Sequence, residues 1–420
     1  MDRTEKDMAE WTKRRIGDMC RTNANSYSPK EGWTFVNYLD TGNITKNVID
    51  EIQFINLCNE KLPSRAKRRV QQNSVLYSTV RPNQLHYGIV KTQPENFLVS
   101  TGFAVLDANP QQLDPDYLYY LLSSKDIVEG LHAIAEQSVS AYPSIKASDI
   151  ENLEVCIPDL DTQKKITAIL MSIDEKIRVN TTINKNLSLQ ISTLCNSWLS
   201  NYEPFGGVLP CDWTLTPLSE VATFTSGYSY KGNELQESNI AMATIKNFDR
   251  NGGFKLDGFK EIIPSSKLKS SQHADLFDTL VAHTDLTQNA EVIGNAEPIL
   301  SFAGYSDIVF SMDVVKVLPS RPEISKFLIA ALLKDKKFKD HCLGYVNGTT
   351  VLHLSKKALP EYNLMLPNDL SVLKPLDDAV SAMYMQMAYN IDESVKLTAL
   401  RDELLPKLMS GEIDVSDLSI

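Results

Sequence analysis

The sequence predicts a mixed α+β protein in which two similar globular domains are each followed by a long helix. Three observations lead to this prediction. Two heptad patterns of apolar residues recur about 210 positions apart, each pattern follows a stretch of β-type runs and turn signals, and each begins shortly after a run that ends in proline. In a chain of 420 residues we therefore expect two copies of one domain-plus-helix unit.

The first long helix is expected from about residue 163 to residue 200. Its apolar residues recur every three or four positions, which produces a narrow seam that faces one neighbouring helix. Two asparagines interrupt the seam, and a buried asparagine fixes the register of a helix pair at a cost in stability. The seam consists of Ile166, Leu170, Ile173, Ile177, Asn180, Asn184, Leu187, Ile191, Leu194 and Trp198.

The second long helix repeats this pattern, and Asn390 lies 210 positions after Asn180. We therefore expect the two helices to pair and the two asparagines to make a direct or near-direct polar contact. Arg401 and Ser394 make this seam less apolar than the heptad ideal. In the alternative, each amphipathic helix packs separately on its own domain. The second seam consists of Leu376, Val380, Met383, Met387, Asn390, Ser394, Leu397, Arg401, Leu404 and Leu408.

The globular parts show matching signals in the same order. β-type runs and one short helix are expected in each part. The runs lie at 74–80, 88–90 and 153–158 in the first part and at 278–284, 308–318 and 362–367 in the second. The short helices lie at 115–123 and 324–333. The resulting segments are a first domain at 1–158, a first helix at 159–202, a second domain at 203–367, and a second helix with a C-terminal tail at 368–420.

The composition indicates an ordinary soluble globular protein, with 43% hydrophobic and 23% charged residues. No apolar run reaches the roughly 18 residues of a membrane span, and the charged start is unlike a signal peptide. The six cysteines contain no CxxC pair, so we expect reduced thiols, no zinc site and a cytoplasmic location. The net charge of −11 argues against a stand-alone nucleic-acid binder, so any DNA contact must use local basic surfaces or partner subunits.

One short motif resembles a methyltransferase signature. Asp114-Pro115-Asp116-Tyr117 is similar to the (Asp/Asn)-Pro-Pro-Tyr motif of amino-methyltransferases, but the third position differs and no Gly-rich cofactor loop follows an early strand. A structural role is favoured, with Asp114 as the N-cap of a helix and Pro115 as its first residue.

A second pattern resembles a nuclease motif. Pro158-Asp159 followed by Asp174-Glu175-Lys176 fits a loose PD…(D/E)xK pattern, but Asp174 and Lys176 flank a helix seam, where charges normally face water. The six histidines show no metal-ligand spacing. We therefore expect no catalytic residue and no metal site in this chain.

The chemical signal that remains is cationic and polar. Five basic residues lie between positions 61 and 69, and arginine and lysine neutralise phosphates while arginine also binds guanine edges. A charge run is usually a solvated face, which is the alternative for this segment. The candidate DNA-contact residues are Arg65, Lys67, Arg68, Arg69, Ser78, Arg81, Asn83 and Tyr142 in the first domain, and Lys246, Arg250, His283, Thr284, Gln288, Asn347, Thr349 and Thr350 in the second.

Several long stretches resemble the specificity (S) subunit of type I restriction-modification systems. They are PSRAKRRV (63–70), LYSTVRPN (76–83), SAYPSIKASDIENLEVCIP (140–158), QKKITAILMSIDEKIRVN (163–180), LVAHTDLTQNAEVIG (280–294) and LRDELLPKLMSGEIDV (400–415). They occur in the order found in that family, and the resemblance covers nearly the whole chain.

The resemblance implies that the two domains are target-recognition domains, each of which reads one half of a split, asymmetric site in double-stranded DNA. It also implies that the two helices form an antiparallel coiled coil that fixes the gap between the half-sites. Two modification (methyltransferase) subunits would bind this chain, and restriction subunits would join the complex. S-adenosylmethionine, ATP and Mg²⁺ would all be bound by these partners, and no cofactor by this chain.

Two other functions remain as alternatives at this point. One is a protein-interaction scaffold whose coiled coil recruits partners and whose domains bind proteins without DNA specificity. The other is a stand-alone nuclease that uses the loose PD…(D/E)xK pattern. Loss of DNA affinity and of its salt dependence on neutralising the basic segment would separate the specificity subunit from the scaffold.

Overall fold

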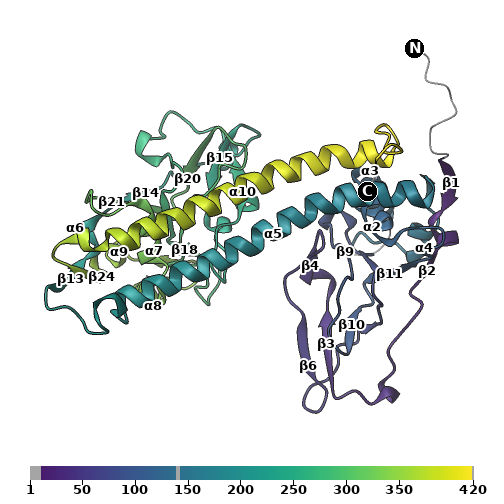
Figure 1. The fold of residues 1–420 in the computed structure, drawn as a ribbon, viewed down its shortest axis with the longest axis horizontal. Coiled ribbons are helices and arrows are strands. Elements are labelled where there is room, and N and C mark those ends of the chain that lie inside the picture. Colours follow the sequence, from purple (N-terminus) through teal and green to yellow (C-terminus); the bar gives the residue numbers. More distant parts are fainter. Residues whose placement is uncertain (1–10, 139–141, 419–420) are drawn as a thin grey trace. The chain divides into compact units, whose positions relative to one another are not determined.

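The computed structural model describes residues 11–138 and 142–418, which form two compact units. Unit 1 comprises residues 1–175 and 398–420, and unit 2 comprises residues 176–397. The boundaries fall inside the two long helices, α5 (Leu160–Leu199) and α10 (Lys374–Met409), so each unit contains a globular part and a segment of both helices (Figure 1). None of the described helices is long and apolar enough to cross a bilayer.

The globular part of unit 1 contains two four-stranded sheets. One has the order β2-β11-β8-β9 and is antiparallel, and the other has the order β6-β3-β10-β7, in which β3 and β10 are parallel. Two-stranded ladders join β1 to β12 and β4 to β5. The elements are β1 (Thr12–Arg15), α1 (Ile16–Met19), β2 (Cys20–Thr22), β3 (Phe35–Leu39), β4 (Ile44–Thr45), β5 (Val48–Ile49), β6 (Gln53–Asn56), β7 (Ala66–Arg68), β8 (Val75–Ser78), β9 (Tyr87–Ile89), β10 (Phe97–Ser100), β11 (Phe103–Ala108), α2 (Pro115–Ser123), α3 (Lys125–Glu136), α4 (Ala147–Glu151) and β12 (Glu154–Ile157).

The central strands of unit 1 are apolar on both faces because they lie between two cores. Val75 and Tyr77 of β8 pack in the core that includes residues of α2 and α5, whereas Leu76 packs in the core that includes Leu39 and Val99 of the second sheet. Successive side chains of a strand point to opposite faces, so a strand covered on both sides needs a continuous apolar run instead of an alternating one.

The globular part of unit 2 has the same plan. Its main sheet has the order β14-β21-β17-β19, and smaller sheets have the orders β16-β15-β20, with β15 and β20 parallel, and β18-β23-β22. The elements are β13 (Trp213–Pro217), α6 (Leu218–Val221), β14 (Ala222–Ser226), β15 (Ile240–Ala243), β16 (Lys260–Glu261), β17 (Thr279–Ala282), β18 (Thr284–Asp285), β19 (Ala296–Pro298), β20 (Asp307–Phe310), β21 (Val314–Pro319), α7 (Lys326–Leu333), α8 (Lys336–Leu343), β22 (Val346–Asn347), β23 (Leu352–Leu354), α9 (Ala358–Glu361) and β24 (Asn363–Pro367).

The two globular parts are copies with the same strand register. In the ladder that closes each domain, Thr12 pairs with Ile157 in unit 1 and Thr214 pairs with Leu366 in unit 2, at offsets of 202 and 209 positions. The central strand pairs, the β8–β11 and β17–β21 ladders, also correspond throughout. The predicted duplication is therefore confirmed, and the changes in offset arise from insertions between paired strands.

The structure refines several expected elements. The run at 308–318 is not one strand: β20 and β21 belong to different sheets and are separated by the turn at 311–313. The helix expected at 324–333 begins at Lys326, because Ser325 is its N-cap and accepts hydrogen bonds from two backbone N–H groups. The short helices α3 and α8 were not expected.

The two long helices are antiparallel within unit 2 and are joined there by buried amides. The Asn180 side chain donates to the Asn390 backbone carbonyl (3.3 Å), Glu393 (2.8 Å) and Ser394 (3.2 Å), while the Asn390 side chain donates to Asn184 (2.8 Å). Asn180 and Asn390 are 1% and 3% exposed. The two asparagines thus meet through the Asn390 backbone, and the side-chain amide pair is Asn390 with Asn184.

Within unit 1 the helices are joined by Arg401. Its guanidinium binds Asp174 (2.8 Å), and the second carboxylate oxygen of Asp174 accepts a hydrogen bond from Tyr120 (2.6 Å). Burial by itself lowers the pKa of Arg401, but the hydrogen bonds and charges of Asp174 and Asp402 outweigh this effect and raise it. Arg401 is therefore an ion-paired group at the helix pair, which explains its place in an otherwise apolar pattern.

The helices also pack on the globular parts. All the seam residues expected from the heptads are buried or half-buried. Tyr384 lies outside the seam, yet it is fully buried in the core that contains β17, β21 and α7 of unit 2. Helix α10 therefore has two covered faces in unit 2, so helix pairing and packing on the domain occur together.

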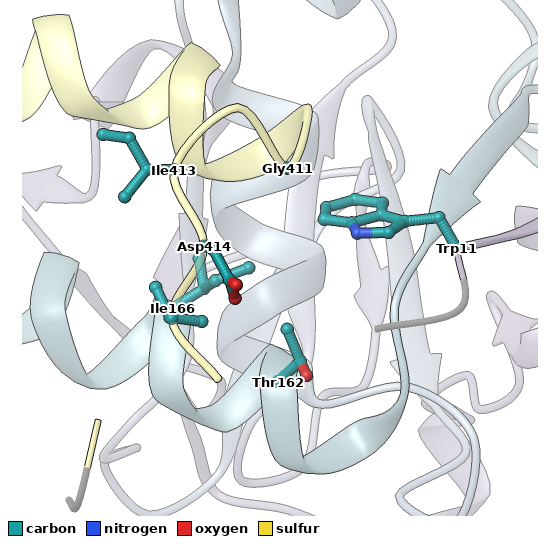
Figure 2. A pocket seen from close by; sticks show the side chains of 7 residues that line it. Trp11, Thr162, Ile166, Gly411, Ile413 and Asp414 are labelled. Carbon is teal, nitrogen blue, oxygen red and sulfur yellow. The ribbon is translucent and has the colours of Figure 1, made fainter. Parts of the chain in front are cut away.

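In unit 1 the segment after α10 packs on the start of α5 and on Trp11 (Figure 2). Gly411 has a positive φ of 76°, and a Cβ there would lie 2.9 Å from the Trp11 ring, so this close approach requires glycine. The shallow pocket beside it is lined by Trp11, Thr162, Ile166, Gly411, Ile413, Asp414 and Val415. The hydroxyl of Thr162 donates to Asp159 (3.0 Å), which forms the N-terminal cap of α5, so the pocket belongs to the structural framework.

Replacement of Asn180 by aspartate should destabilise unit 2 by about 3 kcal/mol or more at pH 7, because a buried carboxylate would face Glu393 and a carbonyl. Burial raises the folded-state pKa of the new carboxyl above its unfolded value, so the loss should shrink below about pH 4 and grow as the pH rises. Native-state hydrogen exchange at several pH values measures this. Asn186→Asp, an exposed change on the same helix, is the control, and an equal loss in both variants would contradict the buried layer.

Replacement of Arg401 by alanine should leave the half-buried Asp174 with Tyr120 alone. We expect the free energy of opening of the 398–409 segment to fall by about 1.5–3 kcal/mol, the range for a hydrogen bond to a charged group. Lys407→Ala on the same helix removes only an exposed ion pair with Glu403 and should cost less than about 0.5 kcal/mol. Hydrogen exchange of this segment compares them, and indistinguishable values would mean that the Asp174 contact is not stabilising.

Candidate nucleic-acid interface

A small three-stranded ladder in unit 2 brings together most of the polar residues expected to contact DNA there. Strand β23 lies between β18 and β22, so that His353 pairs with both Thr284 and Asn347. The turn between β22 and β23 contains Gly348 at φ 113°, where a Cβ would lie 2.2 Å from the Val351 carbonyl oxygen. A glycine is therefore required for the tight return of the chain that exposes the residues after Asn347.

The individual side chains of this ladder differ in their availability. Gln288 is exposed, but its amide nitrogen donates to the carbonyls of Thr349 (2.8 Å) and Thr350 (3.4 Å), so only its oxygen remains to accept a hydrogen bond. Asn347, Thr349 and Thr350 are exposed. Thr284 is 3% exposed and its hydroxyl donates to Asp313 (3.1 Å). Thr284 is thus a structural residue in this fold and not a surface contact, because its strand turns it inward.

His283 adjoins the ladder and is half-buried. Its backbone N–H donates to the carbonyl of Asp313 (2.9 Å), which fixes it beside the turn between β20 and β21. Burial lowers the pKa of its imidazole, and the nearby His353 and Lys356 lower it further. The ring is therefore neutral at neutral pH and offers one hydrogen-bond donor and one acceptor.

Unit 1 has the equivalent arrangement in reduced form. Val80 forms a β-bridge with Ser144, and the corresponding pair in unit 2 is Thr284 with His353, at offsets of 204 and 209 positions. Next to this bridge, the Arg81 guanidinium lies 4.8 Å from the centre of the Tyr142 ring. Asn83, in the 3₁₀ turn Pro82–Gln84, is exposed. The chain therefore places Arg81, Asn83 and Tyr142 together.

Ser78 was expected at this surface, and the structure places it inside. It is 2% exposed in β8, and its hydroxyl donates to the Val80 carbonyl (2.9 Å) and accepts from the Val80 N–H (3.3 Å). Its role is to hold the end of the strand.

The basic segment lies around β7, at the edge of the second sheet of unit 1. Arg65 and Lys67 are exposed, and no ion pair joins either to another described residue. Arg68 is half-buried, and burial lowers the pKa of its guanidinium. Arg69 is ion-paired with Glu31, and its guanidinium lies 4.8 Å from the Trp33 ring centre. Arg65 and Lys67 are thus the most available cations of this segment.

The two basic candidates of unit 2 lie in a different loop. Lys246 is exposed in the 3₁₀ turn Ile245–Asn247, and Arg250 follows in the next loop. The Arg250 side chain pairs with Glu291 at 3.0 Å in a largely exposed ion pair.

The motifs that resembled enzyme signatures have structural roles. Asp114 caps α2 by accepting the Tyr117 N–H (2.9 Å), and Pro115 is its first residue, as expected. Asp174 binds Arg401, and Lys176 pairs with Glu393 at 3.1 Å, so these two charges of the nuclease-like pattern are in ion pairs and do not simply face water. The described residues contain no group of three or more His, Cys, Asp or Glu that could hold a metal ion.

Two residues beside this candidate surface were not among those expected from the sequence. His353 and Lys356 lie in or just after β23 and contribute to the electrostatic environment of His283. Neither belongs to a recognisable motif, and only the strand pairing brings them there. An exposed histidine inside an alternating run, LHL at 352–354, is the one signal that could have suggested His353.

The described architecture can be compared with known proteins. Residues 8–189 match the family model of the type I restriction modification DNA specificity domain. The type I restriction enzyme HindI specificity subunit of Haemophilus influenzae is 23% identical over an alignment that covers 97% of this chain and 100% of the relative. The MjaIX specificity subunit of Methanocaldococcus jannaschii is 22% identical, over 72% of this chain and 70% of the relative.

A solved structure shares the fold. The crystal structure of the S subunit of a type I restriction-modification system from M. genitalium has a TM-score of 0.55 and 18% identity, and the match covers 97% of this chain and 98% of the other. The sequence matches and the duplicated domain-plus-helix architecture agree: the chain is similar to type I restriction-modification specificity subunits over nearly its whole length, and residues 8–189 match their DNA specificity domain.

Proposed function

We propose that this chain is the DNA-recognition subunit of a type I restriction-modification complex and that each unit reads one half of a bipartite, asymmetric DNA site. In unit 1 the reading surface is the region of the Val80–Ser144 bridge, and in unit 2 it is the β18-β23-β22 ladder. The target-recognition domains are assigned to residues 1–158 and 203–367, and the helices with their flanking segments to 159–202 and 368–420.

This proposal rests on one observation: the two domains have the same strand pairing but different side chains at the corresponding surface. The two domains share strand register, including the bridge at the reading surface. The side chains next to that bridge differ, because unit 1 presents Arg81 and unit 2 presents a histidine and amides. Sequence is read by side chains at base edges, so equal scaffolds with different side chains suit the recognition of two different half-sites.

The charge distribution supports separate roles for the residues that read bases and the residues that bind the DNA backbone. The chain carries a net charge of −11, whereas Arg65 and Lys67 form a local, exposed cationic strip at β7. Phosphate contacts position a protein on DNA without reading sequence. In this proposal the β7 strip binds the DNA backbone, and partner subunits supply the remaining positive charge.

The paired helices serve as the spacer that sets the gap between the half-sites, and they are the docking surface for partners. Two modification (methyltransferase) subunits bind the chain, and restriction subunits join them. Adenine methylation then uses S-adenosylmethionine, and cleavage uses ATP and Mg²⁺, all held by the partners. The chain itself contributes no catalytic group and binds no cofactor in this proposal.

A map of methylated adenines provides the direct test. DNA from cells that express this chain with its modification subunit should show a split, asymmetric methylated motif with a fixed gap. DNA from cells with the modification subunit alone should not show it, because the reading surfaces are then absent. Sequencing that detects methylated bases measures both.

The same experiment separates this function from a scaffold. If both proteins are soluble and purify together but the methylation pattern does not depend on this chain, DNA specificity is excluded and the two domains would be binding surfaces for proteins.

Replacement of Lys67 by glutamine should weaken DNA binding equally for specific and non-specific sequences. Loss of one phosphate contact reduces the slope of log K against log salt by about 1, so the slope of the purified complex should become shallower by that amount. Fluorescence anisotropy with labelled duplexes across a salt series measures it.

Lys13→Gln is the matched control for this test. Lys13 is an exposed lysine of the same unit, but it pairs with Glu154 in the β1–β12 ladder, and its loss should not change the slope. A slope that is unchanged in Lys67→Gln, or changed equally in both variants, would exclude a phosphate contact at Lys67.

A further inference from the structure

We propose that Arg81 reads a guanine base in the half-site recognised by unit 1, with Tyr142 as the platform that orients its guanidinium. This inference rests on the proposed DNA-recognition function and makes it more specific. It assigns one base pair, one side chain and one supporting ring, and it follows from the backbone, the contacts and the charge of the loop after β8.

The backbone at Arg81 is held in a conformation that arginine rarely adopts. Its φ of 48° and ψ of 68° lie in the left-handed region. The N–H of Arg81 donates to the Pro143 carbonyl (2.9 Å), and the Arg81 carbonyl accepts from the Gln84 N–H (2.9 Å). Unfavourable backbone conformations held by surrounding contacts concentrate at functional positions. The direction in which the side chain leaves the loop is therefore fixed.

The side chain is oriented as well. The guanidinium lies 4.8 Å from the centre of the Tyr142 ring, and Tyr142 is 59% exposed. Among the residues that the structure describes, no carboxylate forms an ion pair with Arg81 and none accepts a hydrogen bond from its guanidinium. This differs from Arg69, which stacks on Trp33 in a similar way but is already bound to Glu31. Within the described ranges, 11–138 and 142–418, no group binds the guanidinium N–H donors of Arg81, while the Tyr142 ring supports the face of the guanidinium.

The second copy shows that this cation is not part of the shared scaffold. The equivalent position in unit 2, next to the corresponding bridge, is Asp285. Its carboxylate is buried and accepts hydrogen bonds from the Thr287 N–H (2.7 Å), the Thr287 hydroxyl (2.9 Å) and the Val292 N–H (2.9 Å). Asp285 therefore stabilises its own loop. An arginine at this position is a feature of unit 1 alone, as a residue that distinguishes one half-site should be.

The arrangement of donors on the Arg81 guanidinium determines which DNA group it binds. A guanidinium presents two parallel N–H donors, and in the DNA major groove guanine presents two adjacent acceptors, O6 and N7, that match them. A phosphate can also accept this fork, but a phosphate contact needs charge more than orientation, and a mobile lysine serves it. The fixed backbone and the stacked ring at Arg81 provide orientation, which favours a base edge.

The test is a methylation map of cells that express the modification subunit with variants of the full chain. In Arg81→Gln, one G·C position in one half of the motif should become degenerate, with discrimination reduced roughly tenfold to a hundredfold. The other half and the gap should stay unchanged, and they report that the variant is folded and assembled. Tyr142→Ala should relax the same position more weakly, and Tyr142→Phe should retain it, because the ring is kept.

Arg81→Lys distinguishes a base contact from a phosphate contact. It keeps the charge and loses the planar fork, so it should relax the same G·C position. A motif that is unchanged in Arg81→Lys, with methylation uniformly reduced in Arg81→Gln, would establish a phosphate contact and overturn the assignment. An unchanged motif in all variants, or relaxation at an A·T position, would also overturn it. Failure of the proposed function itself is a separate outcome, because the wild-type chain would then give no split motif.

Discussion

The buried amides of the long helices are the constraint on which the rest of the structure depends. A purely apolar seam tolerates sliding by a heptad, because each leucine or isoleucine finds another apolar hole. Asn180 and Asn390 do not tolerate this, since a displaced amide would lie unpaired in a seam where unsatisfied polar groups cost about 1–3 kcal/mol. Both helices also bury residues in the globular parts, so helix pairing and domain packing depend on each other within each unit.

The fold was largely predictable because it is encoded twice. The heptads, the strand-proline-helix order and the offset near 210 each occur in both copies, so a signal that is weak in one copy is supported by the other. The failures have local causes. The run at 308–318 is largely apolar, and the three-residue turn at 311–313 that divides it between two sheets is too short to end the apolar pattern. The role of Asp174 also depended on Arg401, more than 200 positions away in the sequence.

The sequence predicted candidate residues but not how the fold groups them. Some of these polar residues lie together, beside the Val80–Ser144 bridge and in the β18-β23-β22 ladder, and others do not. Residue type could not show that Ser78 and Thr284 are buried, because both lie in strands that the fold covers on both faces, and composition does not reveal this coverage. Residue type also could not separate Arg69, which is bound to Glu31, from Lys67, which is not. Whether a cationic side chain is available for DNA depends on its ion-pair partners, which come together only in the folded chain.

The turn at 311–313 connects the hydrophobic core of unit 2 to the surface beside His283. Asp313 accepts hydrogen bonds from the backbone N–H of His283 and the hydroxyl of Thr284. It lies in the turn after β20 and directly precedes β21, and these two strands belong to different sheets. The surface is thus supported from inside the molecule. Repacking around Phe310 or Val314 would move Asp313 and displace the side chains that it holds. Substitutions in the hydrophobic core can therefore reshape this surface without any change among its exposed residues.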